Sequence, residues 1–528
     1  MSTAIPPTPG AETMNGAEAL VRSLHGAGVE VCFANPGTSE MQFVDALDRT
    51  GLIRCVLGLF EGVVTGAADG YGRMTGKPAV NLLHLGAGLS NAAANLHNAR
   101  RARTPMLNLV GDHASWHLDY DPPLASDIRG LAEPVSHWVR TAARPQSLAA
   151  DGVAAAAAAC SWPGQVATLI APGDTGWDPG GQLAPPVTPE GPAPIAEEAV
   201  VEAAEALEAG PTAVLYLGHS ALADAATLRL AAAIAARTGA RLLCPTSFRR
   251  AERGGDVPDI ERLPYNVDIG VAQLAGLTTA ILIEAVPPVA FFGYPGKPSA
   301  LLPPECRIVT LADVDQNGAE GVARLADRLG IASGDIAFQA PPRPERPAPG
   351  TLDYDTLPPA IASVVPEGAI LIDEGISAGR GLWSAMAACP RHTWLPLTGG
   401  AIGIGPPMAA GAAIACPDRP VIALQADGSA MYTIQALWTQ AREGLNVTTV
   451  IFANRQYEIL KHELVRVGAN PGPSALGLTD IDRPTLDFVA LARGMGVEGC
   501  AVDCPRALAD RLAAAVTEPG PYLIEARF

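Results

Sequence analysis

The sequence predicts an α/β protein built from three doubly wound domains, each with a parallel sheet. Three observations lead to this prediction. The chain has 528 residues, enough for about three domains of roughly 150 residues each. Two proline-rich runs divide it, and in every part short apolar runs are followed by helical patterns. Apolar strands that alternate with helices are typical of parallel sheets covered on both faces.

The proline-rich runs are residues 184–194 (APPVTPEGPAP) and 340–350 (APPRPERPAPG). Proline fits neither a helix interior nor a central strand, so both runs are predicted to be extended linkers. The predicted domains are therefore residues 1–183, 195–339 and 351–528.

The expected strands follow in chain order. The first domain has VEVCFANPG, AVNLLHLG and MLNLVGD, and the second has TAVLYLG, RLLCP, TAILIEA and RIVTLADV. The third has AILIDEG, PVIALQADG and TTVIFAN. Parallel sheets bind their ligands at the carboxyl ends of the strands, so functional residues are expected just after these runs.

Charge and composition exclude several classes of partner. The formal net charge of −18 argues against nucleic acid and anionic membranes, which repel an acidic surface. Nine scattered cysteines indicate core packing in a reducing compartment. The amino-terminal residues lack the pattern of a signal peptide, and the alanine-rich run 154–160 is too short to cross a membrane and is expected to be a packing helix. A cytoplasmic protein is predicted.

The segment 421–460 carries the strongest functional pattern. Asp427 and Asn454 each follow a predicted strand of one βαβ unit. Mg²⁺ prefers oxygen ligands. The predicted ligands are the Asp427 carboxylate, the Asn454 side-chain amide and the backbone carbonyl of Gln456. Gly428 permits close backbone approach to a phosphate. An ordinary Asp-Gly turn is the alternative.

Asn454 follows Asp427 by 27 positions, and Asp427 begins the run DGSAMYTIQALWT. This pattern resembles the thiamine-diphosphate (ThDP) enzymes, benzoylformate decarboxylases in particular, although Ala426 stands where the family has a glycine. The resemblance implies the ThDP-enzyme fold, with pyrimidine-binding, central and diphosphate-binding domains. It also implies a bulky Ile402 under the cofactor and a Gly400 carbonyl that accepts from the aminopyrimidine. Ser377 would hold the diphosphate, a helix N-cap being its alternative. The remaining expected cofactor contacts are Gly428, Ser429, Tyr457 and Glu458.

Glu61 begins the run EGVVTGAADGYGR, which resembles the region of the cofactor-activating glutamate in these enzymes. By that resemblance a protonated Glu61 would hydrogen-bond the pyrimidine ring and thereby activate the cofactor. A solvated acid in the first turn of a helix is the alternative.

Three further residues are predicted around the substrate. Thr38 follows the first strand in NPGT, and His84 precedes Asn91 by seven positions, as the active-site histidine does in benzoylformate decarboxylases. His113 is a candidate substrate contact, although Asp112-His113 departs from the Gly-Gln common in the family. Each has an alternative role. Thr38 is then a turn cap, His84 a packing residue, and His113 one of a metal-binding pair with His117. Tyr457, Ile459, Leu460 and Leu464 are candidates for an apolar wall, with helix packing as the alternative.

The predicted function is Mg²⁺- and ThDP-dependent, non-oxidative decarboxylation of a small 2-oxo acid. The resemblance implies a homodimer or homotetramer with active sites at subunit interfaces. An acetolactate-synthase-like carboligase, a flavin-dependent oxidase and a catalytically silent subunit are the alternatives. In the central domain, three arginines are expected to face a carboxylate, a nucleotide or solvent: Arg249, Arg250 and Arg253. The sequence does not decide whether this domain binds FAD.

Overall fold

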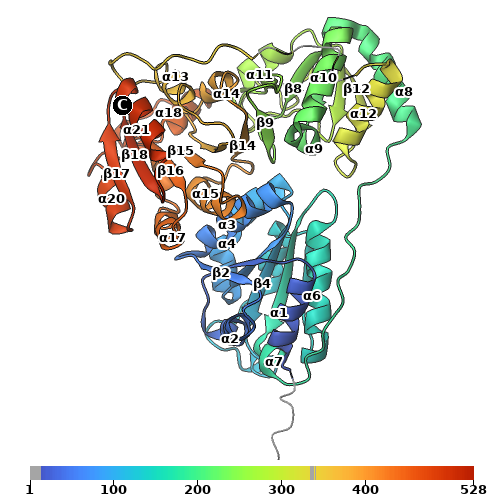
Figure 1. The fold of residues 1–528 in the computed structure, drawn as a ribbon, viewed down its shortest axis with the longest axis vertical. Coiled ribbons are helices and arrows are strands. Elements are labelled where there is room, and N and C mark those ends of the chain that lie inside the picture. The colour runs from blue at the N-terminus through green and yellow to red at the C-terminus, as the bar shows by residue number, and fades with distance from the viewer. Residues whose placement is uncertain (1–13, 333, 335–337, 339) are drawn as a thin grey trace, which may run out of the picture. The chain divides into compact units, whose positions relative to one another are not determined.

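The computed structural model describes residues 14–332, 334, 338 and 340–528. It divides into two compact units, Met1–Glu190 and Gly191–Phe528 (Figure 1). The division falls inside the first predicted linker. Every apolar run expected to form a strand does so, and three sheets result. The three-part α/β architecture predicted from the sequence is thus confirmed.

The first unit contains a six-stranded, wholly parallel sheet in the order β2-β1-β3-β4-β6-β5. Its strands are β1 (Val31–Ala34), β2 (Arg54–Leu57), β3 (Ala79–Leu83), β4 (Met106–Asp112), β5 (Trp138–Thr141) and β6 (Val166–Pro172). Its α-helices are α1 (Gly16–Gly26), α2 (Met41–Thr50), α3 (Glu61–Thr75), α4 (Leu85–Ala102), α5 (Ile128–Ala132), α6 (Pro145–Cys160) and α7 (Gly173–Trp177). Short 3₁₀ helices are η1 (Thr38–Glu40), η2 (Leu118–Tyr120) and η3 (Glu133–Val135).

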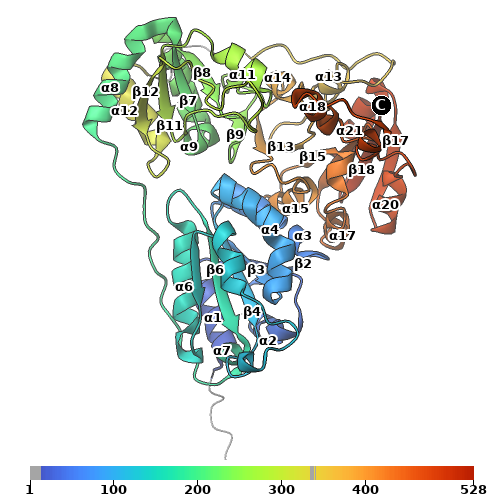
Figure 2. The same cartoon turned by 180° about the vertical axis from the view of Figure 1, so that it is seen from behind.

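Helices cover both faces of this sheet (Figure 2). Helices α1 and α6 pack together on one face, and α3 and α4 pack together on the other. Alternate strand residues such as Val80 and Leu82 point to the α1–α6 side, as the period of two in a strand requires. The alanine-rich run 154–160 is part of α6, whose buried alanines allow close approach to α1.

The second unit begins with a five-stranded parallel sheet in the order β10-β8-β7-β11-β12. Its strands are β7 (Ala213–Leu217), β8 (Arg241–Cys244), β10 (Glu261–Arg262), β11 (Thr279–Ile283) and β12 (Arg307–Ala312). The accompanying helices are α8 (Glu197–Ala206), η4 (Leu207–Thr212), α9 (His219–Ala223), α10 (Ala225–Thr238), α11 (Val267–Leu274) and α12 (Gly318–Leu329). Leu215 and Leu217 enter one core, whereas Val214 and Tyr216 enter another on the opposite face.

The other sheet of this unit has seven strands in the order β17-β18-β16-β15-β13-β14-β9. Its strands are β9 (Ala251–Arg253), β13 (Ile370–Glu374), β14 (His392–Pro396), β15 (Val421–Ala426), β16 (Val447–Ala453), β17 (Glu498–Val502) and β18 (Tyr522–Arg527). Its helices are α13 (Leu357–Ala362), α14 (Leu382–Met386), α15 (Gly405–Ala415), α16 (Asp427–Ala430), α17 (Ala436–Arg442), α18 (Glu458–Arg466), α19 (Pro473–Gly477), α20 (Phe488–Gly494) and α21 (Pro505–Ala515).

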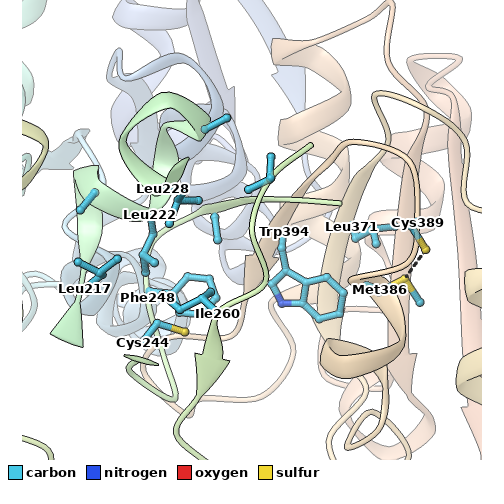
Figure 3. Packing of buried hydrophobic residues seen from close by; sticks show 14 of the residues in the cluster. Leu217, Leu222, Leu228, Cys244, Phe248, Ile260, Leu371, Met386, Cys389 and Trp394 are labelled. Carbon is cyan, nitrogen blue, oxygen red and sulfur yellow. Dashed lines mark hydrogen bonds between the residues drawn. The ribbon is translucent and has the colours of Figure 1, made fainter. Parts of the chain in front are cut away.

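Strand β9 joins the two sheets of the second unit. It lies between β8 and β10 in the sequence but pairs antiparallel with β14, with Ala251 opposite Trp394. One continuous core runs from Leu217 and Phe248 to Trp394 (Figure 3). The central and carboxyl-terminal sheets therefore share buried apolar surface, and this sharing explains why they form one compact unit.

All nine cysteines are free thiols. Among the described residues, no helix is both long and apolar enough to cross a membrane.

Candidate active site

The predicted metal ligands lie together at the carboxyl edge of the seven-stranded sheet. Asp427 follows β15 directly and Asn454 follows β16, and these neighbouring strands pair in register, with Ala426 opposite Phe452. The Asp427 carboxylate accepts a hydrogen bond from the backbone N–H of Arg455, 2.6 Å away. This contact fixes one strand end against the other.

The donor set suits a hard divalent cation. Asp427 is 2% exposed, and burial raises its pKa to about 6, so a nearby cation would stabilise its charged form. Asn454 Oδ1 accepts from the N–H of Gln456 at 3.2 Å, which draws the Gln456 backbone toward the same edge. A carboxylate, an amide oxygen and a carbonyl are the ligands that Mg²⁺ takes beside phosphate.

Ser377 lies past the end of the neighbouring strand β13. Its side chain is buried, and Oγ has no hydrogen-bond partner among the described residues. The preceding Ile376 has a φ of 47°, a left-handed conformation that is rare for a β-branched residue. The next helix, α14, begins only at Leu382, so Ser377 caps no helix. A buried, unpartnered hydroxyl fits a ligand oxygen such as a diphosphate oxygen.

The glycine-rich segment 398–404 forms a loop before α15. Gly400 and Gly403 have φ values of 78° and 99°, which glycine adopts without strain. Buried Glu374 holds the loop by accepting from the N–H of Gly403 at 2.5 Å and of Gly405 at 2.6 Å. Burial raises the pKa of Glu374 to about 7. Half-buried Ile402 lies within this clamped loop.

The sequence analysis missed Glu374. Glu374 follows Asp373 at the end of a strand, and the N–H groups that donate to it lie about 30 positions further along the chain. No local pattern could have indicated that it is buried.

The other predicted cofactor contacts lie at the same edge. A Cβ at Gly428 would collide with the ring of Tyr457, so only glycine allows this ring to lie there. Ser429 is buried in α16. Glu458 accepts from the hydroxyl of Tyr354 and from Asn454 Nδ2.

Helix α18, which follows Tyr457, has no buried residue. Ile459 and Leu464 are half-buried, whereas Leu460 is exposed. An apolar substrate wall at these positions stays a prediction.

In the first unit, Glu61 is the first residue of α3. It is 7% exposed, and its carboxylate accepts from Asn91 Nδ2 at 3.0 Å. The alternative of a solvated first-turn acid is therefore wrong. A buried carboxyl oriented by an amide is suited to hydrogen-bonding a ligand nitrogen.

His84 is the N-cap residue of α4 and lies beside Glu61. A Cβ at Gly88 would be 3.2 Å from Glu61 Oε1 and 3.4 Å from His84 Cβ, so the two side chains flank this glycine. His84 Nδ1 lies 3.0 Å from Glu40 Oε2. Glu40 is fully buried and also accepts from the N–H of Gly37 at 2.8 Å.

Glu40 was missed by the sequence analysis, which stopped at Thr38 in the run NPGTSE. An acid two positions after a strand–turn junction gives no sign of being buried. The only sequence clue is its closeness to the predicted substrate residues.

A cavity of about 300 Å³ in the first unit receives two of the predicted substrate residues, Thr38 and His113. Its apolar lining comes from Leu85, Trp116, Leu124 and Trp177, among others. Thr38 opens η1, whose N-cap is Gly37, so Thr38 is not a helix cap. His113 and His117 have ring centroids 5.8 Å apart. Within the described part of the chain, no three His, Cys, Asp or Glu side chains gather to bind a metal.

Two of the central-domain arginines face carboxylates of their own chain. Arg250 pairs with Glu252 at 2.9 Å, and Arg253 pairs with Asp259 at 2.7 Å. Arg253 is buried and lies over the ring of Trp383 at 3.4 Å. A carboxylate, a nucleotide and solvent were the predicted partners of these arginines. Arg250 and Arg253 face carboxylates.

Comparison with known proteins places the chain in a family. Residues 14–133 match the thiamine pyrophosphate enzyme, N-terminal TPP binding domain, and residues 380–526 match the corresponding C-terminal TPP binding domain. The chain is 50% identical to a Mycobacterium tuberculosis protein named "Putative acetolactate synthase large subunit IlvX", over 97% of this chain and 98% of that protein. It is 29% identical to benzoylformate decarboxylase of Pseudomonas aeruginosa, over 94% and 96% of the two chains.

A solved structure has the same fold. The thiamine diphosphate-dependent 4-hydroxybenzoylformate decarboxylase of Rhodococcus jostii superposes with a TM-score of 0.81 at 24% identity, over 97% of this chain and 99% of that chain. The chain therefore belongs to the thiamine pyrophosphate enzyme family, whose members similar to it include decarboxylases and acetolactate synthases.

Proposed function

We propose that this protein is a ThDP- and Mg²⁺-dependent enzyme that removes CO₂ from a small 2-oxo acid without oxidising it. One observation carries the proposal: Asp427, Asn454 and the unpartnered hydroxyl of Ser377 lie at one sheet edge of a chain with ThDP-binding domains. Bound there, ThDP supplies a nucleophilic carbon and an electron-accepting ring. Asp427, Asn454 and the Gln456 carbonyl would hold the metal, and Ser377 would donate to the diphosphate.

Glu61 has the contacts needed to activate a pyrimidine ring. The Asn91 amide orients the Glu61 carboxyl, which the first turn of α3 holds in place. With ThDP bound, the Glu61 carboxyl would hydrogen-bond the pyrimidine ring nitrogen and share a proton with it. Asn91 thus acts as a positioning residue for Glu61.

His84 has the contacts of a proton carrier. The buried Glu40 carboxylate accepts from Nδ1–H and so selects the tautomer. Nε2 is then the atom that exchanges a proton with the substrate or product. The neighbouring cavity, with its tryptophan and leucine lining, would receive the side chain of the 2-oxo acid.

Carboligation is a second candidate, and a separate observation favours it. In the second unit, the ring of Phe291 covers Gly400, because a Cβ there would lie 2.7 Å from Phe291 Cζ. Phe291 packs with Tyr265 and Phe292 at centroid distances of 5.1 and 5.0 Å. The aromatic surface over Gly400 is the ring of Phe291, which carries no acidic proton. It would shield the decarboxylated fragment from protonation and favour its attack on a second carbonyl compound.

The test is a panel of aromatic and aliphatic 2-oxo acids supplied with ThDP and Mg²⁺. CO₂, aldehyde and hydroxyketone are measured separately. Aldehyde equal to CO₂ supports simple decarboxylation, and hydroxyketone in its place supports carboligation. Absence of CO₂ from every 2-oxo acid would contradict both.

Phe291→Ala, with Phe292→Ala as its matched control, tests the shielding. If Phe291 excludes proton donors, only the first substitution raises the aldehyde fraction.

A further inference from the structure

The central sheet has a topological switch point between β7 and β11. From β7 the chain continues outward to β8 and β10, and then returns to place β11 and β12 on the other side of β7. Gly218 follows β7 and Glu284 follows β11. In parallel α/β sheets, nucleotides and other ligands bind in the crevice at such a point, outside the carboxyl ends of the strands.

The side chain of Glu284 occupies this crevice. The residue is 1% exposed. Its Oε2 accepts from the N–H of Ser220 at 2.7 Å, from the N–H of Ala221 at 3.4 Å and from the hydroxyl of Ser220. Gly318, at the start of α12, lies against the same oxygen, because a Cβ there would be 2.6 Å from it. Donors that would suit a phosphate oxygen thus converge on a carboxylate of the chain itself.

The backbone at this point is strained. Glu284 has a φ of 50° and His219, on the facing strand end, has a φ of 26°. Non-glycine residues seldom adopt these values, and such strain persists only where surrounding contacts enforce it. Burial also raises the pKa of Glu284 to about 7. Strain and burial both disfavour an acid here, and the hydrogen bonds from Ser220 and Ala221 offset that cost.

We infer that the Glu284 carboxylate takes the place of a nucleotide phosphate in the central domain, so that this domain binds neither FAD nor another nucleoside diphosphate. A phosphate at the same donors would displace the side chain or lie against its negative charge. The inference is independent of the proposed function. It leaves no place in this crevice for the flavin that an oxidase would need as its electron acceptor.

The first test is the nucleotide content of the full-length protein. The protein is heat-denatured and the supernatant is analysed for released flavin and adenine nucleotide. FAD and ADP are then titrated into the native protein, with saturating ThDP and Mg²⁺ present to fill the diphosphate site. We expect no released flavin and no saturable binding. Flavin near one per chain, or tight ADP binding by the unaltered protein, would overturn the inference.

Two substitutions test the role of the carboxylate. Glu284→Gly relieves the positive φ and frees the donors, and we expect saturable ADP binding with a Kd at least tenfold below the highest ADP concentration at which the unaltered protein shows none. Glu284→Gln keeps the shape and removes the charge, so a smaller gain is expected. Asp121→Gly is the matched control, since Asp121 also has a positive φ, 49°, but lies in the first unit. A folded Glu284→Gly or Glu284→Gln protein with no gain in ADP affinity refutes the inference, as does an equal gain in the control.

Discussion

Replacing Glu374 with glutamine should change the pH dependence of stability in a calculable way. Glu374 is fully buried and accepts from two glycine N–H groups. Burial raises its pKa from 4.5 to about 7. Ionising it in the folded state therefore costs roughly 3 kcal/mol, at 1.36 kcal/mol for each unit of pKa.

The sign follows from the raised pKa. The contribution of Glu374 to stability is fully present below pH 4.5 and is lost as the pH rises to about 7. Glutamine does not titrate, but its amide NH₂ cannot accept, so one glycine N–H loses its partner at a cost of about 1–3 kcal/mol. At pH 8 the two effects offset each other, and the Glu374→Gln protein should be nearly as stable as the parent. At pH 5 it should be less stable by about 1–3 kcal/mol.

Urea unfolding of the full-length proteins at pH 5 and pH 8 measures the difference in free energy of unfolding between the parent and Glu374→Gln. Glu498→Gln, an exposed acid on β17, is the control for loss of one surface charge. The difference between Glu374→Gln and the parent should be larger at pH 5. The same difference at both pH values would refute the role given to burial.

Three further predictions concern single residues of the proposed function. Glu61→Gln should leave ThDP affinity within a few-fold of the parent but lower kcat by about 10²–10⁴-fold; binding is measured calorimetrically, and near-normal turnover would contradict the assigned role. Ser377→Ala should raise the Kd for ThDP by about threefold to tenfold, the loss of one hydrogen bond, and should leave the unfolding midpoint unchanged because Oγ has no partner in the described chain; a loss of stability would show a structural hydroxyl instead. Glu40→Gln should lower kcat by about tenfold or more and displace the pH profile of kcat, because the negative charge beside His84 Nδ1 is lost; an unmoved profile would leave Glu40 with a purely structural role.

Much of the fold could be predicted because it depends on local patterns. Apolar runs such as 213–217 and 421–426 are long enough to identify buried parallel strands, and the polar residues that follow them lie at the expected sheet edges. The position of Asp427 beside Asn454 follows from this rule alone. Strand β9 could not be predicted, because Ala-Glu-Arg has no strand pattern and its partner β14 lies about 140 residues away.

The buried acids Glu40, Glu284 and Glu374 were also beyond prediction. Glu284 and Glu374 accept from backbone N–H groups of distant segments, at Ser220 and Gly403 among others. Glu40 accepts from the N–H of nearby Gly37, and its distant partner is His84. Burial of a carboxylate depends on all such partners, and the distant ones cannot be read from the sequence around the acid. These residues could be found only once the loops were placed.

The most direct test of the account is a crystal structure of the protein with ThDP and Mn²⁺ in place of Mg²⁺, with anomalous data collected for the manganese. We predict one strong anomalous peak per chain, about 2.2 Å from an oxygen of Asp427 and from Oδ1 of Asn454, with the diphosphate bound to the same ion. A peak held by other residues, or ThDP bound in full with no ion at this edge, would contradict it.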